Sequence, residues 1–178
     1  TLRRLVSEFS AFARLPEAQI EPADLNEFLR DCSRSLEAVA ELGEHPKTSV
    51  RWRLASEPLP VRIDAMMLRR CLDNLVRNAV QALRDDPDGG TVEVRSRRGD
   101  ARAVIEVADN GPGISLDARS FVFDPYYTTK SDGTGLGLAI VKKVVLEHGG
   151  EILCKDSEMG GVSFVITLPM RTATSINE

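Results

Sequence analysis

The sequence predicts an α+β domain, and three observations predict it. After an amphipathic stretch at residues 2–15, apolar residues recur at helical spacing in three further stretches, at about residues 24–43, 64–84 and 134–148. Short alternating or apolar runs typical of strands occur between and after these stretches. A Gly-x-Gly-x-Gly string at residues 133–137 stands where a loop runs into the last helical stretch.

The composition is that of one ordinary globular domain with a short appendage. The chain has 178 residues, of which 42% are hydrophobic and 28% are charged. The net charge of −4, without a basic stripe that includes aromatic residues, gives no support to nucleic-acid binding. Three widely spaced cysteines predict free thiols in a reducing compartment, so we expect a cytoplasmic location. No apolar run approaches the ~20 residues that span a bilayer, so an inner-membrane anchor of the parent protein would lie outside this sequence.

The stretch Leu2–Leu15 predicts an amphipathic helix that stops before Pro16. A helix of about fourteen residues cannot bury such a stripe alone. We therefore expect it to pack on a partner helix or a second subunit; folding back onto its own domain is the alternative. Residues 17–22 are predicted to be a polar connector.

Asp24 and Glu27 form a capping-box pattern at the start of the helix predicted to end near Gly43. The remaining patterns predict strands and a polar tail. The strands outside the hairpin described below are expected at residues 50–54, 61–63, 152–153 and 162–168, and the tail at residues 171–178.

Asp64 is expected to cap a long helix that runs to about Arg84. Asn74 and Asn78 lie four residues apart and therefore project from one face, which Gln81 extends. A carboxamide oxygen suits Mg2+, which usually takes one or two protein ligands besides phosphates and water. The alternative is a solvated polar face.

Residues 92–94 and 103–108 are predicted strands that pair as a hairpin. The second strand ends in Asp109-Asn110-Gly111-Pro112-Gly113-Ile114. Asp-Asn-Gly is by itself a common turn. A carboxylate fixed at the end of a buried strand can instead accept a hydrogen bond from an exocyclic amine such as that of adenine, while the glycines let a ring approach the backbone.

An aromatic-rich segment at residues 121–130 leads into the glycine string. Its rings either anchor a loop on the core or hold one end of a mobile lid. The glycines leave backbone N–H groups uncovered, and the following helix adds free donors and the positive end of its dipole. This predicts a phosphate-binding hinge, with a flexible loop before a packed helix as the alternative. The string matches neither a P-loop nor a dinucleotide fingerprint.

Four motifs in this order resemble the sequence boxes of sensor histidine kinase catalytic domains. They are Asn74 and Asn78 on a helix, Asp109-x-Gly111-x-Gly113, Phe123, and Gly133-x-Gly135-x-Gly137. Such domains belong to the GHKL ATPase superfamily, with gyrase B, MutL and a heat-shock chaperone. The resemblance covers about residues 20–170, and Phe-Asp-Pro-Tyr-Tyr-Thr-Thr-Lys at residues 123–130 is most similar to nitrogen-regulation type sensors. It implies a Bergerat ATP-binding fold, a two-layer α/β sandwich whose mixed sheet has helices on one face.

The resemblance also implies a role for each motif. Asn78 would hold Mg2+ through its side-chain oxygen, with Asn74 supporting the metal or the phosphates. Asp109 would accept the adenine amine. Lys130 and Arg77 would neutralise charge on the γ-phosphate. The other residues expected to contact the nucleotide are Gly111, Gly113, Ile114, Phe123, Gly133, Thr134, Gly135, Leu136, Gly137 and Leu138.

Two departures from the family limit what the resemblance implies. Many of these kinases carry Lys where Gln81 stands, so one charge directed at the phosphates is missing, although Gln also occurs there in the branch that this chain resembles. Val162 and Ser163 follow Gly160-Gly161 where relatives often continue with Thr or Ser.

The residue four places before the metal-binding asparagine distinguishes reaction types within the superfamily. Relatives that hydrolyse ATP carry Glu there, whereas Asn74 cannot take a proton. Transfer to a histidine on a separate helical hairpin is therefore expected instead of fast hydrolysis. Neither His45 nor His148 matches the acceptor motif, so the acceptor is expected outside this sequence. Residues 1–16 would be the last part of that hairpin, and residues 17–170 the catalytic domain.

Three functions stay open from the sequence. The leading hypothesis is the catalytic domain of a histidine kinase that uses Mg-ATP, acts on its own hairpin in a homodimer and serves a response regulator. A nucleotide-sensing or docking module without phosphoryl transfer is the second. A serine kinase of the anti-sigma type, with the same pocket, is the third.

Overall fold

The computed structural model describes residues 17–41, 48–84, 89–130 and 133–171. The helix predicted at Leu2–Leu15 lies outside the described residues. So does the tail predicted at residues 171–178 except for Arg171, whose N–H donates to the carbonyl of Pro60 at 2.9 Å. Within the described part, no helix is both long enough and apolar enough to cross a bilayer.

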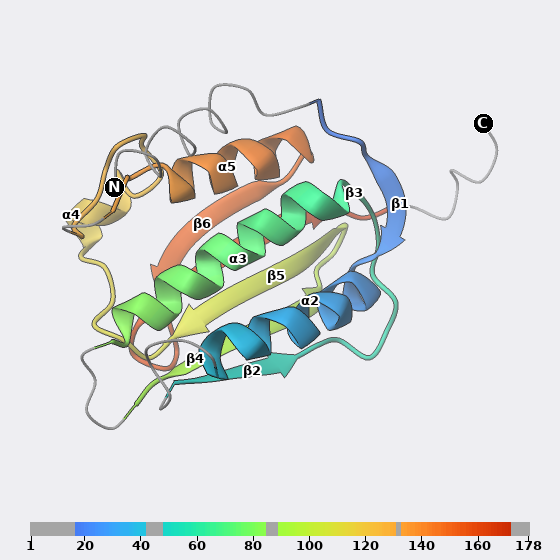
Figure 1. Cartoon of the computed structure of the whole chain (residues 1–178). Coiled ribbons are helices and arrows are strands. Elements are labelled where there is room, and N and C mark those ends of the chain that lie inside the picture. The colour runs from blue at the N-terminus through green and yellow to red at the C-terminus, as the bar shows by residue number, and fades with distance from the viewer. Residues whose placement is uncertain (1–16, 42–47, 85–88, 131–132, 172–178) are drawn as a thin grey trace.

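A five-stranded mixed sheet forms one layer of the fold (Figure 1). Its strands are β2 (Ser49–Arg53), β4 (Thr91–Arg98), β5 (Arg102–Asp109), β6 (Glu151–Asp156) and β7 (Val162–Pro169). They lie in the order β2-β4-β5-β7-β6, with β2 parallel to β4 and all other neighbours antiparallel. The predicted hairpin of β4 and β5 is confirmed, with Val94 opposite Val107.

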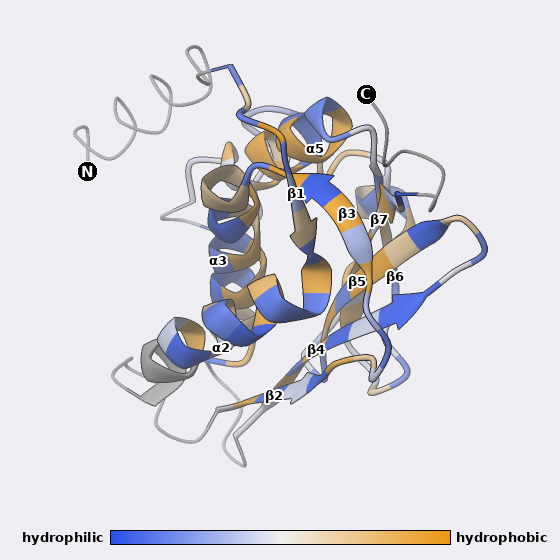
Figure 2. Cartoon of the chain, turned by 90° about the vertical axis from the view of Figure 1, so that its right-hand side faces the viewer, coloured by the Kyte–Doolittle hydropathy of each residue, from blue (hydrophilic) through white to orange (hydrophobic). Residues whose placement is uncertain are grey.

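Three helices form the second layer, on one face of the sheet (Figures 1 and 2). They are α2 (Leu25–Glu41), α3 (Ala65–Ala82) and α5 (Gly137–Glu147). Leu68, Leu72 and Leu75 of α3 are fully buried, as the helical spacing predicted. Val92 and Val94 of β4 are buried on the helix side of the sheet. The predicted two-layer α+β architecture is therefore confirmed.

Both helix starts predicted from aspartates are confirmed. Oδ1 of Asp24 accepts hydrogen bonds from the backbone N–H groups of Asn26 and Glu27, at 2.8 and 3.1 Å. Oδ1 of Asp64 caps α3 by accepting from the N–H groups of Met66 and Met67, both at 3.0 Å. Each side chain satisfies donors that a helix leaves free at its first turn.

Two short elements were not predicted. The connector expected at residues 17–22 is wrong at its end, because residues Glu21–Asp24 form strand β1, antiparallel to β3 (Pro60–Ile63). β1 lacks an alternating apolar pattern, so its pairing partner rather than its own sequence makes it a strand. The short helix α4 (Leu116–Arg119) is capped by Ser115, whose Oγ accepts from Ala118 N–H at 3.4 Å.

The cysteines are free thiols, as their number and spacing predicted. Cys32 and Cys71 are fully buried in the core, and Cys154 is half-buried. Burial raises the pKa of Cys71 to about 12 and that of Cys32 to about 11.

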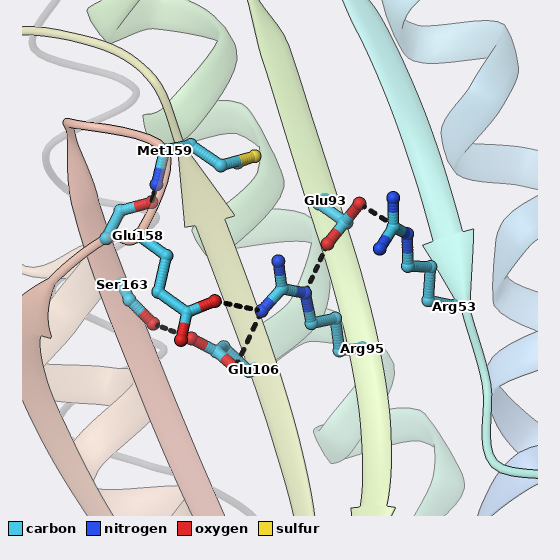
Figure 3. Close-up of polar contacts among 8 residues, drawn as sticks. Arg53, Glu93, Arg95, Glu106, Glu158, Met159 and Ser163 are labelled. Atoms are coloured by element: carbon cyan, nitrogen blue, oxygen red, sulfur yellow. Dashed lines mark hydrogen bonds and ion pairs between the residues drawn. The ribbon is translucent and has the colours of Figure 1, made fainter.

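The sheet face turned away from the helices carries a charged network (Figure 3). Glu93, only 2% exposed, accepts from Nε of Arg53 at 2.8 Å and from Nε of Arg95. Arg95 also lies 3.2 Å from a carboxylate oxygen of Glu158. Alternation along β4 places Glu93 and Arg95 opposite to the core-facing valines. The network therefore lies outside the core that joins helices and sheet.

A hydrogen-bonded junction links the start of α3, the end of α5 and residue 19. Oδ2 of Asp64 accepts from the backbone N–H of Gln19 at 2.9 Å. The N–H of Asp64 donates to Nε2 of His148 at 2.9 Å, and Nδ1 of His148 donates to the carbonyl of Val144 at 2.7 Å. These two bonds require a neutral imidazole with its proton on Nδ1. His148 is thus a buried structural residue.

Candidate functional site

A cavity of about 550 Å³ lies between α3, the end of β5, the start of β7 and the start of α5. Residues far apart in the chain line it together. They are Asn74, Asn78, Ala79, Gln81, Ala82, Asp109, Pro112, Gly113, Ile114, Val122, Tyr127, Thr128, Thr129, Lys130, Gly133, Thr134, Gly135, Gly137, Leu138, Val162 and Phe164.

Asp109, the last residue of β5, brings a buried carboxylate to this cavity. Its side chain is held through one oxygen, Oδ1, which accepts from the N–H groups of Gly111 at 2.9 Å and Val162 at 3.2 Å. Within the described part of the chain, Oδ2 accepts no hydrogen bond. Burial raises the pKa of Asp109, and the two backbone donors oppose that shift. Asp109 thus presents one fixed, free acceptor atom.

Gly161 makes room for this carboxylate. A Cβ at residue 161 would lie 2.1 Å from Oδ1 of Asp109 and 2.5 Å from its carbonyl oxygen. The N–H of Gly161 also donates to that carbonyl at 3.2 Å. Any side chain at this position would therefore displace Asp109.

The wall beside Asp109 is fixed by Arg119 of α4. Nε of Arg119 donates to the carbonyl of Ile114 at 2.9 Å, and its Nη1 donates to Oδ2 of Asp156 in β6 at 3.1 Å. This pairing with Asp156 raises the pKa of Arg119 and lowers that of Asp156. Ile114, which lines the cavity, is thus tied to the edge of the sheet.

The asparagines of α3 face the cavity in a row, as their spacing predicted. The Cβ that Gly137 lacks would lie 3.2 Å from Oδ1 of Asn74, so the first residue of α5 approaches this row closely. No group of three or more His, Cys, Asp or Glu side chains suited to a metal occurs among the described residues. A metal in this cavity would therefore be coordinated by carboxamide oxygens and by atoms of a molecule bound there.

Gly135, the middle glycine of the predicted hinge, has a backbone conformation that favours glycine. Gly135 has φ of +68°, and a Cβ there would lie 2.4 Å from the carbonyl carbon of Tyr126. The N–H of Tyr126 donates to the carbonyl of Gly135 at 2.9 Å, which joins the two sides of the loop at its base. The close approach of these two backbones excludes a side chain at position 135.

The helix after the hinge begins later than predicted. α5 starts at Gly137, not near Thr134, because Gly135 takes a left-handed conformation that no α-helix contains. Its N-cap residue, Leu136, makes no side-chain capping bond, unlike the aspartates before α2 and α3. The first turn of α5 therefore has no side-chain cap, and a helix start of this kind can bind an anion.

Lys130 reaches from the loop to α3. Its Nζ donates to Oε1 of Gln81 at 2.7 Å and to Oδ1 of Asn78 at 3.3 Å. Among the described residues that line the cavity, Lys130 has the one positive side chain and Asp109 the one negative side chain. The remaining polar lining consists of neutral side chains and backbone.

Most residues predicted for the site line this cavity, and four do not. Gly111 lies behind Asp109 and holds its oxygen. Phe123 packs edge-to-face on Phe164, with ring centroids 6.1 Å apart, and so supports a residue of the lining. Leu136 is fully buried in the core. Arg77 is exposed and does not line the cavity; its positive charge lowers the pKa of Asp73, which burial raises more strongly.

The predicted site left out several lining residues. Gln81 was predicted only to extend the polar row of α3, and it lines the cavity with Asn74 and Asn78. Val162 and Phe164 come from β7, more than fifty residues after Asp109, as the pairing of β5 with β7 determines. No local sequence pattern predicts that these β7 residues lie beside Asp109.

A family model matches residues 63–172, more than half of the chain. Its description is "Histidine kinase-, DNA gyrase B-, and HSP90-like ATPase". The matched range runs from the cap of α3 to the end of β7 and includes every residue that lines the cavity.

Curated relatives resemble nearly the whole chain. Nitrogen regulation protein NtrY of Azorhizobium caulinodans is 34% identical over 161 residues, which are 88% of this chain and 20% of NtrY. Sensor histidine kinase ZraS of Escherichia coli strain K12 is 34% identical over 170 residues, 95% of this chain and 35% of ZraS. The chain therefore spans between a fifth and about a third of the length of these relatives.

Solved structures of histidine kinases share the fold. The catalytic domain of histidine kinase ThkA superposes with a TM-score of 0.74 and 30% identity, covering 85% of this chain and 95% of that domain. Full-length ShkA in complex with AMPPNP superposes with a TM-score of 0.80 and 30% identity, covering 97% of this chain and 36% of ShkA. The chain belongs to the histidine kinase-, DNA gyrase B- and HSP90-like ATPase family, and it is an ATP-binding catalytic domain of the sensor histidine kinase kind.

Proposed function

We propose that the cavity binds Mg-ATP and that the protein containing this chain transfers the γ-phosphoryl group to a histidine outside this sequence. One observation carries the proposal. Asp109, the carboxamides of α3 and the glycine hinge, which are far apart in the sequence, line a single cavity. That cavity offers an acceptor for an amine, donors for phosphates and oxygens for a metal.

Asp109 is the proposed partner of the adenine amine. Its Oδ2 is free within the described chain, whereas Oδ1 is held by two backbone donors. Ile114, Val122 and Val162 supply apolar contacts for the base in the same lining. A purine with an exocyclic amine satisfies the acceptor and the apolar surface together.

The start of α5 and Lys130 are the proposed phosphate contacts. The uncapped N–H groups of α5 and the helix dipole attract an anion. Asn78 is the proposed Mg2+ ligand and Asn74 its neighbour. The residues fit this ion because their donors are oxygens and because Asn78 Oδ1 already faces a cation, the Lys130 ammonium. When bound, magnesium supplies charge neutralisation at the phosphates.

Phosphoryl transfer rather than hydrolysis suits the lining. In the transfer, a histidine nitrogen forms a bond to the γ-phosphorus while the bond to the β,γ-bridging oxygen breaks and ADP leaves. Asp109 is the one carboxylate in the described lining; its Oδ1 accepts from two backbone donors, and its Oδ2 is the proposed partner of the adenine amine. Asn74 provides no base for water, so this chain's residues position and neutralise the nucleotide without activating a competing nucleophile.

The proposed partners follow from the relatives. A solved complex joins histidine kinase ThkA to response regulator protein TrrA, and that kinase is 26% identical to this chain, with a TM-score of 0.78 over 96% of it. We propose a response regulator as the final acceptor and a helical hairpin, in a homodimer of the full protein, as the first.

The test supplies γ-labelled ATP, Mg2+ and an acceptor hairpin to this chain. Acid-labile, base-stable label on the hairpin is expected, and at sub-saturating ATP the Asp109→Asn variant should transfer much less. Bound ATP without any transfer would indicate a docking module, and acid-stable label would indicate a serine kinase; either result contradicts the proposal.

A further inference from the structure

Gln81 holds the one positive charge of the described cavity lining. The 2.7 Å contact from Nζ of Lys130 to Oε1 of Gln81 is at the short end of the usual range for N–H···O bonds, about 2.7–3.2 Å. The 3.3 Å contact to Oδ1 of Asn78 lies beyond that range. Gln81 is therefore the stronger of these two contacts of the Lys130 ammonium.

The backbone of Lys130 is fixed on both sides. Its N–H donates to Oγ1 of Thr128 at 3.1 Å, and its carbonyl accepts from the N–H of Gly133 at 3.2 Å. A Cβ at residue 133 would lie 2.3 Å from Oγ1 of Thr128, the hydroxyl that accepts from the N–H of Lys130, and would disturb that contact. With the backbone held in this way, the contact to Oε1 of Gln81 holds the end of the side chain beside α3.

We propose that Gln81 is a positioning residue for Lys130 and a determinant of triphosphate over diphosphate binding. It holds the ammonium beside Asn78 in the nucleotide-free protein, so the charge is in place for the terminal phosphate. The inference rests on the proposed function, since it takes the cavity to be the Mg-ATP site.

A neutral oxygen at residue 81 is what this role requires. Glutamate would bind the ammonium as an ion pair and offset the charge that the phosphate needs. Lysine would repel Lys130 at this distance. The glutamine oxygen directs the ammonium without cancelling its charge.

Two side-chain oxygens of α3 would each serve a different cation. If Oδ1 of Asn78 bound a metal, its 3.3 Å contact with the Lys130 ammonium would be lost, whereas the 2.7 Å contact to Oε1 of Gln81 would remain. Residues 78 and 81 are three apart on one helix face, so the ammonium and a metal would lie side by side. Such an arrangement matches the neighbouring charges of a terminal phosphate.

The first test needs no nucleotide. The intact chain is treated with an amine-acylating reagent, and modification of Lys130 is measured by mass spectrometry relative to the exposed Lys155. Gln81→Ala should raise the relative rate at Lys130 roughly three- to ten-fold, because the 2.7 Å contact to Oε1 of Gln81 holds Nζ against α3 and away from the reagent. Gln81→Glu should lower it. Met66→Ala, a neutral exposed change on the same helix and outside the cavity, should leave it unchanged.

The second test compares affinities for ATP and ADP in the presence of Mg2+. Gln81→Ala should lower the ratio of ATP to ADP affinity roughly three- to ten-fold, with ADP affinity within about two-fold of the parent. Gln81→Ala combined with Lys130→Met should equal Lys130→Met alone, because a positioning residue acts only through its partner.

The two tests separate the inference from the function on which it rests. A shifted acylation rate without any nucleotide binding would overturn the proposed function and leave the pairing of Gln81 with Lys130 intact. Nucleotide binding with an unchanged acylation rate at Lys130, or additive effects in the double variant, would overturn the role of Gln81. Gln81 is exposed and alanine favours helices, so these variants should fold.

Discussion

Replacing Asp109 with asparagine should separate nucleotide binding from folding. The carboxamide oxygen can keep both backbone bonds, from Gly111 and Val162, that the carboxylate oxygen Oδ1 accepts. The amide NH2 group would then replace Oδ2 and point a donor where an adenine amine also brings a donor. A hydrogen bond to a charged acceptor contributes about 1.5–3 kcal/mol, so ATP affinity should fall on the order of 10- to 100-fold.

The free energy of unfolding of Asp109→Asn should not fall with its ATP affinity, and should instead be unchanged or higher. Burial raises the pKa of Asp109 above 3.8, so the folded protein binds this proton more tightly than the unfolded chain does. As pH rises from 3.8 through the raised pKa, ionisation of the Asp109 carboxyl lowers the free energy of unfolding. Asparagine does not ionise, so the variant does not lose this stability. The variant should be at least as stable as the parent at pH 7, with its advantage growing as pH rises through that window.

The assay pairs calorimetric titration with ATP and thermal unfolding without nucleotide at several pH values. Asp100→Asn, an exposed change of the same kind in the hairpin turn, is the control and should alter neither quantity. If Asp109→Asn lost stability and affinity in parallel, or lost neither, Asp109 would not be the adenine acceptor.

Four further predictions follow from the geometry. Asn78→Ala should abolish the Mg2+ dependence of ATP binding while leaving the metal-free affinity within about three-fold, measured with and without chelator; a retained dependence would exclude Asn78 as the ligand. Gly161→Ala should lower the free energy of unfolding by about 1–3 kcal/mol and abolish ATP binding, because the added Cβ meets Asp109 at 2.1 Å; unchanged denaturant curves would contradict this. Glu93→Ala should cost about 1–3 kcal/mol of stability by leaving Arg95 without its closest partner, but should spare ATP affinity, since the network lies on the far face of the sheet. At pH 8, a thiol reagent should modify Cys154 first, since the pKa of Cys71 is about 12 and that of Cys32 about 11; labelling of the buried pair in folded protein would refute their inertness.

Local patterns predicted the elements whose sequence alone determines them. The capping aspartates of α2 and α3, the stripe of α3 and the β4–β5 hairpin each depend on residues close together in the chain. The row of Asn74 and Asn78 followed from a spacing of four residues. β1 was missed because it is a strand only by pairing with β3, about forty residues away.

The individual motif residues of the site were predictable from the sequence, but the contacts that bring them together were not. The motifs pointed to Asp109 and the glycine hinge, but the room that Gly161 leaves for Asp109 depends on the pairing of β5 with β7. The meeting of Lys130 with Gln81 depends on a loop crossing to a helix 49 residues earlier. No sequence window contains either contact.

The junction of Gln19, Asp64 and His148 connects residue 19 to α3 and α5, the two helices that line the cavity. Asp64 uses one carboxylate oxygen for the cap of α3 and the other for Gln19, so a displacement of residue 19 pulls on the same side chain that anchors the helix carrying Asn74 and Asn78. His148 ties that point to the last turn of α5, whose first turn faces the phosphates in our proposal. Residue 19 and the two helices that line the cavity are therefore joined at one point by side-chain hydrogen bonds.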